Sequence, residues 1–256
     1  MMTHYININV EYTADICTIR FNRDHKCNAF SNAMSEEVLS AIRAAEKNCR
    51  AIVLTANPDI KVWSSGHDLS EIHDVKELIH DPMFDLFNGI INSPVPIICA
   101  IDGDVYAGGF LIALFADIVL ATERSHFCMT VNKMGIPLPE YCYAFAISVL
   151  GARKAKEMFL CSKPIDAVDG YAQGLVNYVV TTPAQLEERL STLLEGICLC
   201  MPEGLAYTKA VFNSLTHGMV DNLRHTPGIR QQYRNLVANP EVVHRVNALI
   251  SKLSRR

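Results

Sequence analysis

Two loops carry the residue types that could hold a negatively charged oxygen. They are residues 61–71 (KVWSSGHDLSE) and residues 101–111 (IDGDVYAGGFL). In each loop, small residues follow a short apolar run and precede a predicted helix, whose first backbone N–H groups lack partners and favour negative charge. Small residues also let a ligand approach the main chain closely. Together the loops could place two N–H donors around one oxygen, which is the arrangement of an oxyanion hole.

The first loop contains a helix-start signal of its own. Asp68 and Glu71 have the spacing of a capping box, which predicts that a helix begins there. The residues that would lie at the start of that helix are Ser65, Gly66 and His67. In the second loop, the Gly-Gly pair could instead be no more than a tight connection between a strand and a helix.

The segments around these loops alternate between strand and helix patterns. A hairpin is predicted at residues 6–21, and further strands are predicted at the apolar runs 51–56, 95–101 and 117–121. Helices are predicted at residues 31–47, where apolar side chains recur at helical spacing, and at residues 108–115. Short runs that are apolar throughout are typical of strands buried on both faces. This order therefore predicts a mostly parallel sheet covered by helices.

Beyond about Gly135 the chain becomes mostly helical. The predicted helices are 141–150, 153–160, 167–173, 183–200, 202–215 and 220–251, with breaks at Gly218, Pro227 and Pro240, and one more strand is predicted at 176–180. We therefore expect an α/β core over residues 1–182 and an all-helical region over residues 183–256. The apolar face of that helical region predicts contact with a neighbouring subunit.

Composition excludes several classes of protein. The chain has 256 residues, of which 50% are hydrophobic and 20% charged, with a formal net charge of −4. No segment gathers enough Lys and Arg to bind nucleic acid, and no apolar run approaches the ~18 residues that a membrane span needs. The N-terminus lacks a signal-peptide pattern and the nine cysteines are an odd number, so we expect a cytoplasmic protein with reduced thiols. Cys198 and Cys200 lack a second pair of ligands, so no metal site is predicted.

The two loops resemble the signature segments of the crotonase (enoyl-CoA hydratase/isomerase) superfamily. The matching segments are KVWSSGHDLSEI and IDGDVYAGGFLIALFADIVLA, and the similarity extends to residues 23–31, 125–137 and 164–180. The resemblance implies a crotonase-like α/β fold, with a repeated ββα core and a C-terminal all-helical region that builds trimers or hexamers. It also implies an acyl-CoA thioester as substrate, with coenzyme A as part of that substrate and no separate cofactor.

The resemblance also assigns roles to single residues. It implies that the thioester oxygen is held by the backbone N–H groups of His67 and Gly108, with the imidazole beside the substrate. The residues expected to contact the acyl group or coenzyme A are Lys26, Asn28, Ala29, Ser64, Ser65, Gly66, Asp68, Leu69, Thr130, Leu138, Tyr141 and Lys252. For Lys252 the alternative is a solvated cation at a helix end. A few cations are enough for the phosphates of coenzyme A, without a basic protein.

Three aliphatic residues stand where relatives carry reactive groups. A hydratase of this family needs two carboxylates to activate water and deliver a proton, and the matching positions here are Leu111 and Val131. Hydration of an enoyl-CoA is therefore not expected. The segments resemble the methylmalonyl-CoA decarboxylase branch most, although Leu138 replaces the tyrosine of that branch. Loss of CO₂ itself generates the enolate, so a decarboxylase needs no strong base, and His67 and Thr130 could orient the carboxylate.

Two alternatives stand beside a decarboxylase-like lyase. Glu140 resembles the glutamate of one branch of Δ3,Δ2-enoyl-CoA isomerases, which moves a proton between C2 and C4, although here it lies one residue later. Otherwise Glu140 is an exposed first-turn residue favoured by the helix dipole. Tyr141 or Tyr143 could replace the missing phenol, or could simply pack. The aliphatic positions also allow a crotonase-fold protein that binds coenzyme A or a partner without catalysis.

A polar cluster follows the first loop. Its members are His73, Asp74, His80, Asp81 and Asp85. We expect this segment to cover the acyl pocket as a lid rather than to bind a metal ion. Asp102 and Asp104 could brace the second loop, with helix capping as the simpler explanation.

Overall fold

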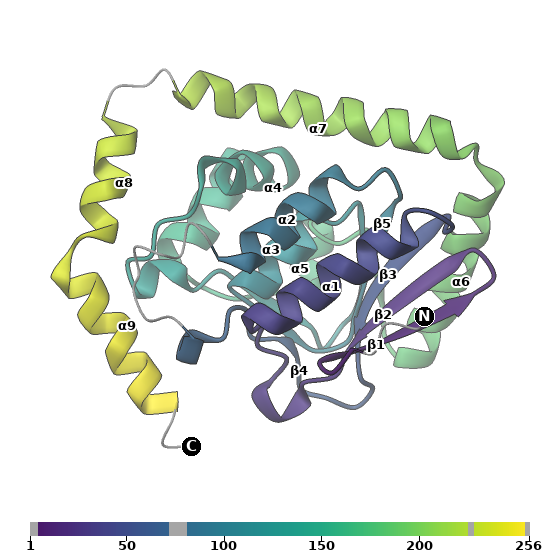
Figure 1. Cartoon of the computed structure of the whole chain (residues 1–256), viewed down its shortest axis with the longest axis horizontal. Coiled ribbons are helices and arrows are strands. Elements are labelled where there is room, and N and C mark those ends of the chain that lie inside the picture. The colour runs from purple at the N-terminus through teal and green to yellow at the C-terminus, as the bar shows by residue number, and fades with distance from the viewer. Residues whose placement is uncertain (1–4, 72–80, 225–227, 254–256) are drawn as a thin grey trace.

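Two β-sheets organise the chain. The computed structural model describes residues 5–71, 81–224 and 228–253. A six-stranded sheet has the order β1-β2-β3-β5-β7-β10, and a four-stranded sheet has the order β4-β6-β8-β9 (Figure 1). The larger sheet consists of β1 (Ile8–Thr13), β2 (Ile16–Phe21), β3 (Ala51–Ala56), β5 (Ile97–Ile101), β7 (Ile118–Thr122) and β10 (Tyr178–Val180). The smaller consists of β4 (Val62–Ser64), β6 (Asp104–Tyr106), β8 (His126–Cys128) and β9 (Ile165–Asp166).

The central strands of the larger sheet are buried on both faces. β1 and β2 form the predicted antiparallel hairpin, and the remaining neighbours pair in parallel. Ile52 and Leu54 of β3 point into the cluster built with α1 (Asn32–Ala45) and α2 (Pro82–Asn92), whereas Val53 packs with Leu186 of α6 (Pro183–Leu199). Both side-chain sets of β3 are therefore apolar, which explains why its sequence has no polar alternation.

The core repeats one unit of two strands and a helix. The first strand of each unit (β3, β5 or β7) enters the larger sheet, and the second (β4, β6 or β8) enters the smaller sheet. The helices that follow are α2, α3 (Gly108–Phe115) and α4 (Glu140–Cys161). The expected repeated ββα core is confirmed. The second strands have three residues each, too few for an alternating pattern, so the residues alone do not predict them.

Long helices complete the described chain. After α5 (Ala167–Ala172) and α6 come α7 (Pro202–Arg224), α8 (Ile229–Val237) and α9 (Pro240–Leu253). Figure 1 shows α7 across the top of the molecule, with α8 and α9 along the side away from α6. The predicted break at Gly218 is wrong, because α7 continues through it: one glycine costs only about 1 kcal/mol in a helix. The break at Pro240 is confirmed, and the one at Pro227 lies outside the described residues.

A buried charge holds α7 to the core. Lys209 Nζ donates hydrogen bonds to the Asp117 carboxylate (2.7 Å), to the Ile90 carbonyl (3.1 Å) and to the Val95 carbonyl (3.4 Å). Asp117 also accepts a hydrogen bond from the backbone N–H of Ile97 at the start of β5 (2.7 Å). α7 is thereby tied to the end of α2 and to the larger sheet.

Three features of the described residues bear on disulfides, metal sites and membrane-spanning helices. All nine cysteines are free, and five of them are buried. The described residues contain no group of His, Cys, Asp or Glu side chains arranged to hold a metal ion. Within the same residues, every helix is too short or too polar to cross a membrane.

Candidate active site

A mostly apolar cavity of about 620 Å³ lies beside the two loops singled out from the sequence. Its wall includes Ser65, His67 and Asp68 of the first loop, and Ala107 and Gly108 of the second. Its apolar lining residues are Leu69, Met83, Phe84, Phe87, Leu111, Val131, Met134, Ile136, Leu138, Leu249 and Ile250. Such a concave apolar space with a few polar groups is typical of a binding site for a small molecule.

Sheet pairing brings the two loops together. β4 and β6 are parallel neighbours in the smaller sheet, so the loops that follow them leave from the same edge. A β-carbon on Gly66 would lie 2.7 Å from the backbone nitrogen of Gly108, and one on Gly108 would lie 3.4 Å from that of His67. Both N–H groups belong to residues that line the cavity, and neither donates a hydrogen bond within the described part of the chain. The two backbone nitrogens therefore belong to loops that approach each other closely beside the cavity.

The second loop is held in an unusual backbone conformation. Ala107, which precedes the first residue of α3, has φ 47° and ψ −113°. Its N–H donates to the Cys128 carbonyl of the adjacent strand (2.9 Å). A residue other than glycine in this region is strained by about 1–3 kcal/mol, and such strain is often found at functional sites. The turn at Ala107 sets the direction of the Gly108 N–H.

A short helical turn begins after Asp68 in the first loop, as the spacing predicts, and Asp68 Oδ1 accepts from the Ser70 N–H (3.1 Å), but the reciprocal bond of a capping box is not formed. The Ser65 N–H donates to the Cys27 carbonyl (3.0 Å), and the Asp68 N–H donates to the Phe30 carbonyl (2.8 Å). The Glu71 carboxylate accepts from the N–H of Asn32 (2.7 Å) instead of reaching back to Asp68. Only the short turn η2 (Leu69–Glu71) follows in the described residues. The carbonyls of Cys27 and Phe30 thus accept the N–H groups of Ser65 and Asp68, which lie on either side of Gly66 and His67.

Gly66 and Ser64 belong to the same arrangement. The Gly66 N–H donates to Ser64 Oγ (3.2 Å), and Ser64 Oγ donates to the Asn28 carbonyl (3.0 Å). Asn28 is buried, and its Oδ1 accepts from the backbone N–H of Arg23 (2.9 Å). None of Asn28, Ser64 and Gly66 lines the cavity. Their hydrogen bonds hold the backbone of the cavity wall in place without lining the cavity, and the N–H of His67 is left without a partner among the described residues.

An ion pair that the sequence analysis did not identify braces this wall. Arg23 donates to the Asp68 carboxylate (2.7 Å) and to the Ala29 carbonyl (2.9 Å). Burial opposes ionisation of Asp68, but hydrogen bonds from Ser70 and Arg23 outweigh it and lower the pKa of the carboxyl. Asp68 therefore lies at the cavity wall as an anion held by its ion pair with Arg23 and by hydrogen bonds from Ser70.

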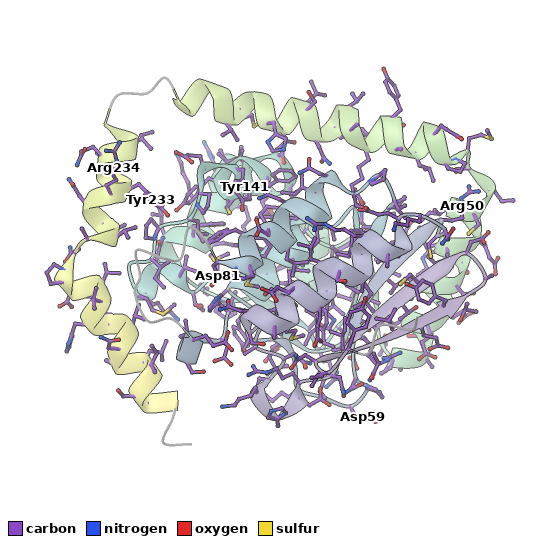
Figure 2. The ribbon with its side chains drawn as sticks, viewed as in Figure 1. Arg50, Asp59, Asp81, Tyr141, Tyr233 and Arg234 are labelled. Atoms are coloured by element: carbon purple, nitrogen blue, oxygen red, sulfur yellow. The ribbon has the colours of Figure 1, made fainter. Side chains whose placement is uncertain are left out.

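A second unpredicted contact joins His67 to α2. His67 Nε2 and Asp81 Oδ2 form a hydrogen bond, and both side chains line the cavity. Asp81 is also the N-cap of α2, because its Oδ1 accepts from the Met83 N–H (2.8 Å). Figure 2 shows Asp81 in the interior of the molecule. The Asp-Pro pair is a recognisable helix-start signal, but nothing in it reveals the histidine; His73, Asp74 and His80 of the predicted lid lie outside the described residues.

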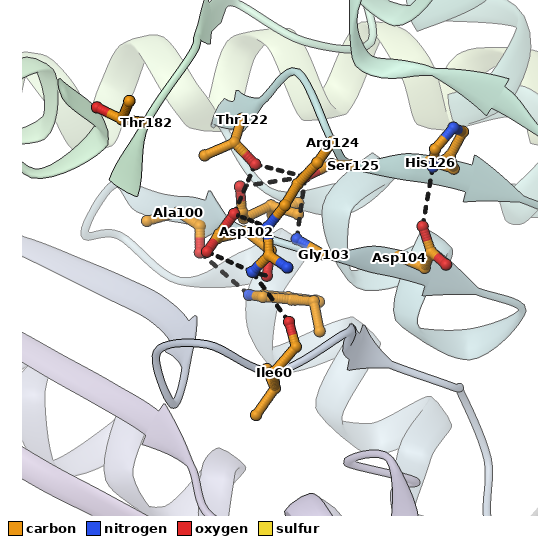
Figure 3. Close-up of polar contacts among 12 residues, drawn as sticks. Ile60, Ala100, Asp102, Gly103, Asp104, Thr122, Arg124, Ser125, His126 and Thr182 are labelled. Atoms are coloured by element: carbon orange, nitrogen blue, oxygen red, sulfur yellow. Dashed lines mark hydrogen bonds and ion pairs between the residues drawn. The ribbon is translucent and has the colours of Figure 1, made fainter. Parts of the chain in front are cut away.

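A polar network behind the second loop confirms that Asp102 and Asp104 brace it (Figure 3). Asp102 accepts from Thr122 (2.7 Å) and Arg124, and Arg124 donates onward to the Ile60 carbonyl (2.9 Å). Asp104 accepts from the Tyr106 hydroxyl (3.1 Å) on one oxygen and pairs with His126 (2.9 Å) on the other. The capping explanation for the two aspartates is wrong, since they hold neighbouring strands and loops together.

The sequence-predicted residues divide into two groups. Those that line the cavity are Lys26, Ala29, Ser65, His67, Asp68, Leu69, Gly108, Thr130 and Leu138. Those that do not are Asn28, Ser64, Gly66, Glu140, Tyr141 and Lys252. Lys252 is exposed on α9, whose contribution to the lining is the apolar pair Leu249 and Ile250. The structure therefore brings the loop residues together and leaves the C-terminal lysine apart.

Glu140, Tyr141 and Tyr143 do not line the cavity. Glu140 is the first residue of α4, and its charge contributes, after burial, to raising the pKa of Tyr233 on α8. The Tyr141 ring packs against Phe115 with centroids 5.7 Å apart, and burial raises the pKa of its phenol. The Tyr143 hydroxyl accepts from the Leu138 N–H (3.4 Å). Figure 2 shows Tyr141 apart from Asp81 and on the side of the core toward α8 and Tyr233.

The cavity contains few groups able to move a proton. Leu111 and Val131 line it at 2% and 7% exposure, so no carboxylate stands at either position. The carboxylates among the described lining residues are Asp68 and Asp81. With Asp68 held by Arg23, the pair of His67 and Asp81 is the acid–base group best placed to act inside the cavity.

Comparisons with known proteins agree with this architecture. The family model "Enoyl-CoA hydratase/isomerase" matches residues 11–236. The chain is 26% identical to methylmalonyl-CoA decarboxylase of Escherichia coli (strain K12), over 97% of this chain and 96% of the relative. It is 25% identical to a probable enoyl-CoA hydratase of Rhizobium meliloti (strain 1021), over 97% and 96%.

Solved structures give the same result. A structure of methylmalonyl-CoA decarboxylase in complex with 2-nitronate-propionyl-CoA superimposes with a TM-score of 0.88 at 25% identity, and covers 97% of each chain. The expected crotonase-like α/β fold with C-terminal helices is confirmed by this match and by the family model, and the structure builds it with two mixed sheets.

Proposed function

The chain belongs to the enoyl-CoA hydratase/isomerase family, and on that premise we propose that it removes CO₂ from a short malonyl-type acyl-CoA. Family membership supports a crotonase-fold enzyme that acts on an acyl-CoA. The specific activity, that of a lyase similar to methylmalonyl-CoA decarboxylase, is our proposal.

One observation carries the proposal: His67 and Gly108 both line an apolar cavity, their loops approach each other closely, and neither backbone N–H has a partner among the described residues. A thioester oxygen that accepts from both donors would be stabilised most when it carries the negative charge of an enolate. Fixed donors in a water-poor site need no reorganisation during the reaction, and losing one such donor typically costs on the order of 10²–10³ in rate. The cavity is therefore suited to reactions that pass through a thioester enolate.

The residues around the donors favour decarboxylation over hydration. Hydration needs groups that activate water and deliver a proton, and Leu111 and Val131 can do neither. When a carboxylate leaves the α-carbon as CO₂, the electron pair of the broken C–C bond passes into the thioester and forms the enolate directly. No base is required for that step. The hydroxyl of Thr130, which lines the cavity, is available to orient the departing carboxylate.

The coenzyme A end of the substrate fits the exposed side of the cavity. His25 and Lys26 line it from an exposed turn, η1 (Asp24–Lys26), and offer positive charge to the phosphates. Asn28, Ser64 and Gly66 would act through the backbone that they hold in place. Lys252 would contribute only if it bent toward the phosphates from α9.

The test is a panel of thioesters followed by mass spectrometry. We expect methylmalonyl-CoA or malonyl-CoA to lose CO₂ with a kcat in the usual enzyme range of ~1–10³ s⁻¹, and crotonyl-CoA to be hydrated no faster than without protein. Efficient hydration of crotonyl-CoA would contradict the proposal. Binding of coenzyme A without turnover of any thioester would favour the non-catalytic alternative.

The variant Glu140→Gln distinguishes a decarboxylase from an isomerase. Because Glu140 does not line the cavity, Glu140→Gln should leave decarboxylation unchanged within about twofold. Turnover of a 3-enoyl-CoA by the wild type that disappears in Glu140→Gln would instead support an isomerase that moves this residue inward.

We also propose that copies of the chain associate as a trimer or a hexamer. Large apolar side chains are exposed along α7 and just before it: Leu199, Met201, Tyr207, Phe212 and Leu215. An apolar surface of this kind is typical of a subunit interface. Analytical ultracentrifugation should give the mass of three or six chains of 28.5 kDa, and a monomer at micromolar concentration would contradict the proposal.

A further inference from the structure

We propose that His67, oriented by Asp81, is the acid that places a proton on the α-carbon of the enolate, and that the enzyme consequently exchanges the α-hydrogen of its acyl-CoA product with water. This inference rests on the proposed function, since it assumes an acyl-CoA thioester in the cavity. It adds a side chain that transfers a proton, and a second measurable activity, to a site in which backbone N–H groups stabilise the enolate and Thr130 orients the carboxylate.

The geometry of the His67 ring supports the role. Its side chain is 15% exposed and that of Asp81 is 10% exposed, so the pair is largely shielded from bulk water. Nε2 is taken by the hydrogen bond to Asp81. Nδ1 is buried and has no hydrogen-bond partner in the described part of the chain. Nδ1 is therefore the ring nitrogen without a protein partner, on a residue that lines the cavity, and we place the α-carbon of the substrate against it; this requires the bound substrate to displace the atoms that cover Nδ1 in the described structure.

Asp81 gives the ring a defined orientation. A carboxylate on one ring nitrogen fixes the tautomer and stabilises the imidazolium, which leaves the other nitrogen to exchange a proton with substrate. Asp81 is itself held in place, because its second oxygen caps α2 through the Met83 N–H (2.8 Å). The methionine side chain then covers the other donor residue: a β-carbon on Gly108 would lie 2.4 Å from Met83 Cε. The start of α2 thus contacts both donor residues.

Other polar side chains of the lining are less suited to protonate carbon. Hydrogen bonds from Ser70 and Arg23 outweigh the effect of burial and lower the pKa of Asp68, so it stays ionised. Burial and the charge of Asp104 raise the pKa of Tyr106 to about 12, and its hydroxyl already donates to that aspartate. His25 and Lys26 lie in the exposed turn, where water competes.

Decarboxylation and protonation of the enolate form two successive steps. Departure of CO₂ breaks the C–C bond and leaves the electron pair in the enolate, whose oxygen accepts from the N–H groups of His67 and Gly108. The enolate pair then forms a C–H bond with the Nδ1 proton of the protonated ring. The ring becomes neutral and keeps its Nε2 proton toward Asp81, and water restores the Nδ1 proton. In reverse, the Nδ1 lone pair removes the α-hydrogen of the product, so the same pair must catalyse exchange.

The test uses propionyl-CoA in D₂O, with NMR and mass spectrometry. We expect the wild type to incorporate a single deuterium at one prochiral position of C2. Decarboxylation of methylmalonyl-CoA in D₂O should place deuterium at that same position, because one ring serves one face of the enolate. Absence of exchange above a protein-free control would overturn the inference.

Variants of the ring keep both backbone donors. His67→Gln and His67→Ala should slow exchange on the order of 10²–10⁴, the usual contribution of a general acid or base. Residual decarboxylation by these variants should place deuterium at both positions equally, since water then protonates the enolate; a ring with only a structural role would leave the stereochemistry intact. Asp81→Asn should lower exchange at least tenfold, and it provides an independent test if a His67 variant does not fold.

The control is His244→Gln. His244 is exposed on α9 and does not line the cavity, so exchange should be unchanged. Folded His67→Gln protein that exchanges at the wild-type rate with unchanged stereochemistry would overturn the inference. Exchange without release of CO₂ from any malonyl-type thioester would contradict the proposed function and leave the inference standing. Release of CO₂ without exchange, and with deuterium placed at random, would support the proposed function and overturn the inference about His67.

Discussion

Gly66 and Gly108 lie so close together that a β-carbon on Gly66 would stand 2.7 Å from the backbone nitrogen of Gly108. The two glycines come from different loops, which meet because β4 and β6 are parallel neighbours. Gly66 also has φ +89°, a backbone conformation that side chains disfavour. The distance between the two proposed donors therefore depends on the absence of a side chain at this position.

Gly66→Ala should damage the site more than the fold. The added methyl group must push the two loops apart, which separates the His67 and Gly108 N–H groups. We expect turnover to fall on the order of 10²–10³, as for loss of one oxyanion donor, and stability to fall by about 1–3 kcal/mol. Steady-state kinetics and urea unfolding measure the two effects. Gly196→Ala, at an open helical site, is the control: turnover should be unchanged, and stability should rise by up to about 1 kcal/mol because alanine favours the helix.

The Gly108 donor can be removed by a pair of matched variants. Both Gly108→Ala and Gly108→Pro add a β-carbon that displaces the flexible end of Met83, but only proline lacks the N–H. Proline is tolerated at the first position of a helix, which Gly108 occupies in α3. We expect kcat for the proline variant to be about 10²-fold below that of the alanine variant. Equal activities in the two folded proteins would remove the Gly108 N–H from the mechanism.

The Arg23–Asp68 pair should make stability depend on pH in acid. The pKa of Asp68 is lowered in the folded protein, so its contribution is complete above the unfolded value of about 3.9 and is lost as the pH falls through the folded value. Urea unfolding at a series of pH values from about 5 to 2 should show a shallower loss for Asp68→Asn than for the wild type. An identical slope would show that Asp68 does not contribute.

The same pair tests the cavity wall at neutral pH. Arg23→Ala leaves a buried carboxylate without its cation and should cost about 3 kcal/mol. The double variant Arg23→Ala, Asp68→Asn should recover part of that loss, because it no longer buries an unpaired charge. A double variant as unstable as Arg23→Ala would indicate that the arginine acts through its hydrogen bond to the Ala29 carbonyl instead.

The Lys209–Asp117 pair should control the docking of α7. Lys209→Met removes the cation from Asp117, whose pKa is raised by burial although the lysine opposes this. We expect a loss of about 3–5 kcal/mol, measured by chemical unfolding. Adding Asp117→Asn should restore part of it while keeping an acceptor for the Ile97 N–H. Lys154→Met, whose partner Glu157 is half exposed, is the control and should cost less than about 1 kcal/mol.

Local patterns predicted most elements correctly. The run at residues 51–56 is β3, the run at 95–101 contains β5, and the helix at 108–115 coincides with α3. These predictions succeed because each pattern follows from burial or spacing within a few residues. The prediction fails where local signals compete with distant partners. Gly218 does not break α7, and Glu71 bonds to the N–H of Asn32 instead of completing a capping box.

The sequence by itself determined the two loops, the family resemblance and the absence of carboxylates at Leu111 and Val131, because these depend only on residue types and order. Tertiary structure decided which N–H groups have no partner, since the Cys27 and Phe30 carbonyls accept those of Ser65 and Asp68 and leave that of His67 free within the described ranges. It also decided that Asp81 meets the His67 ring while Glu140 does not line the cavity. Neither outcome can be read from spacing, because a side chain's partner depends on how separate strands and helices pack in space.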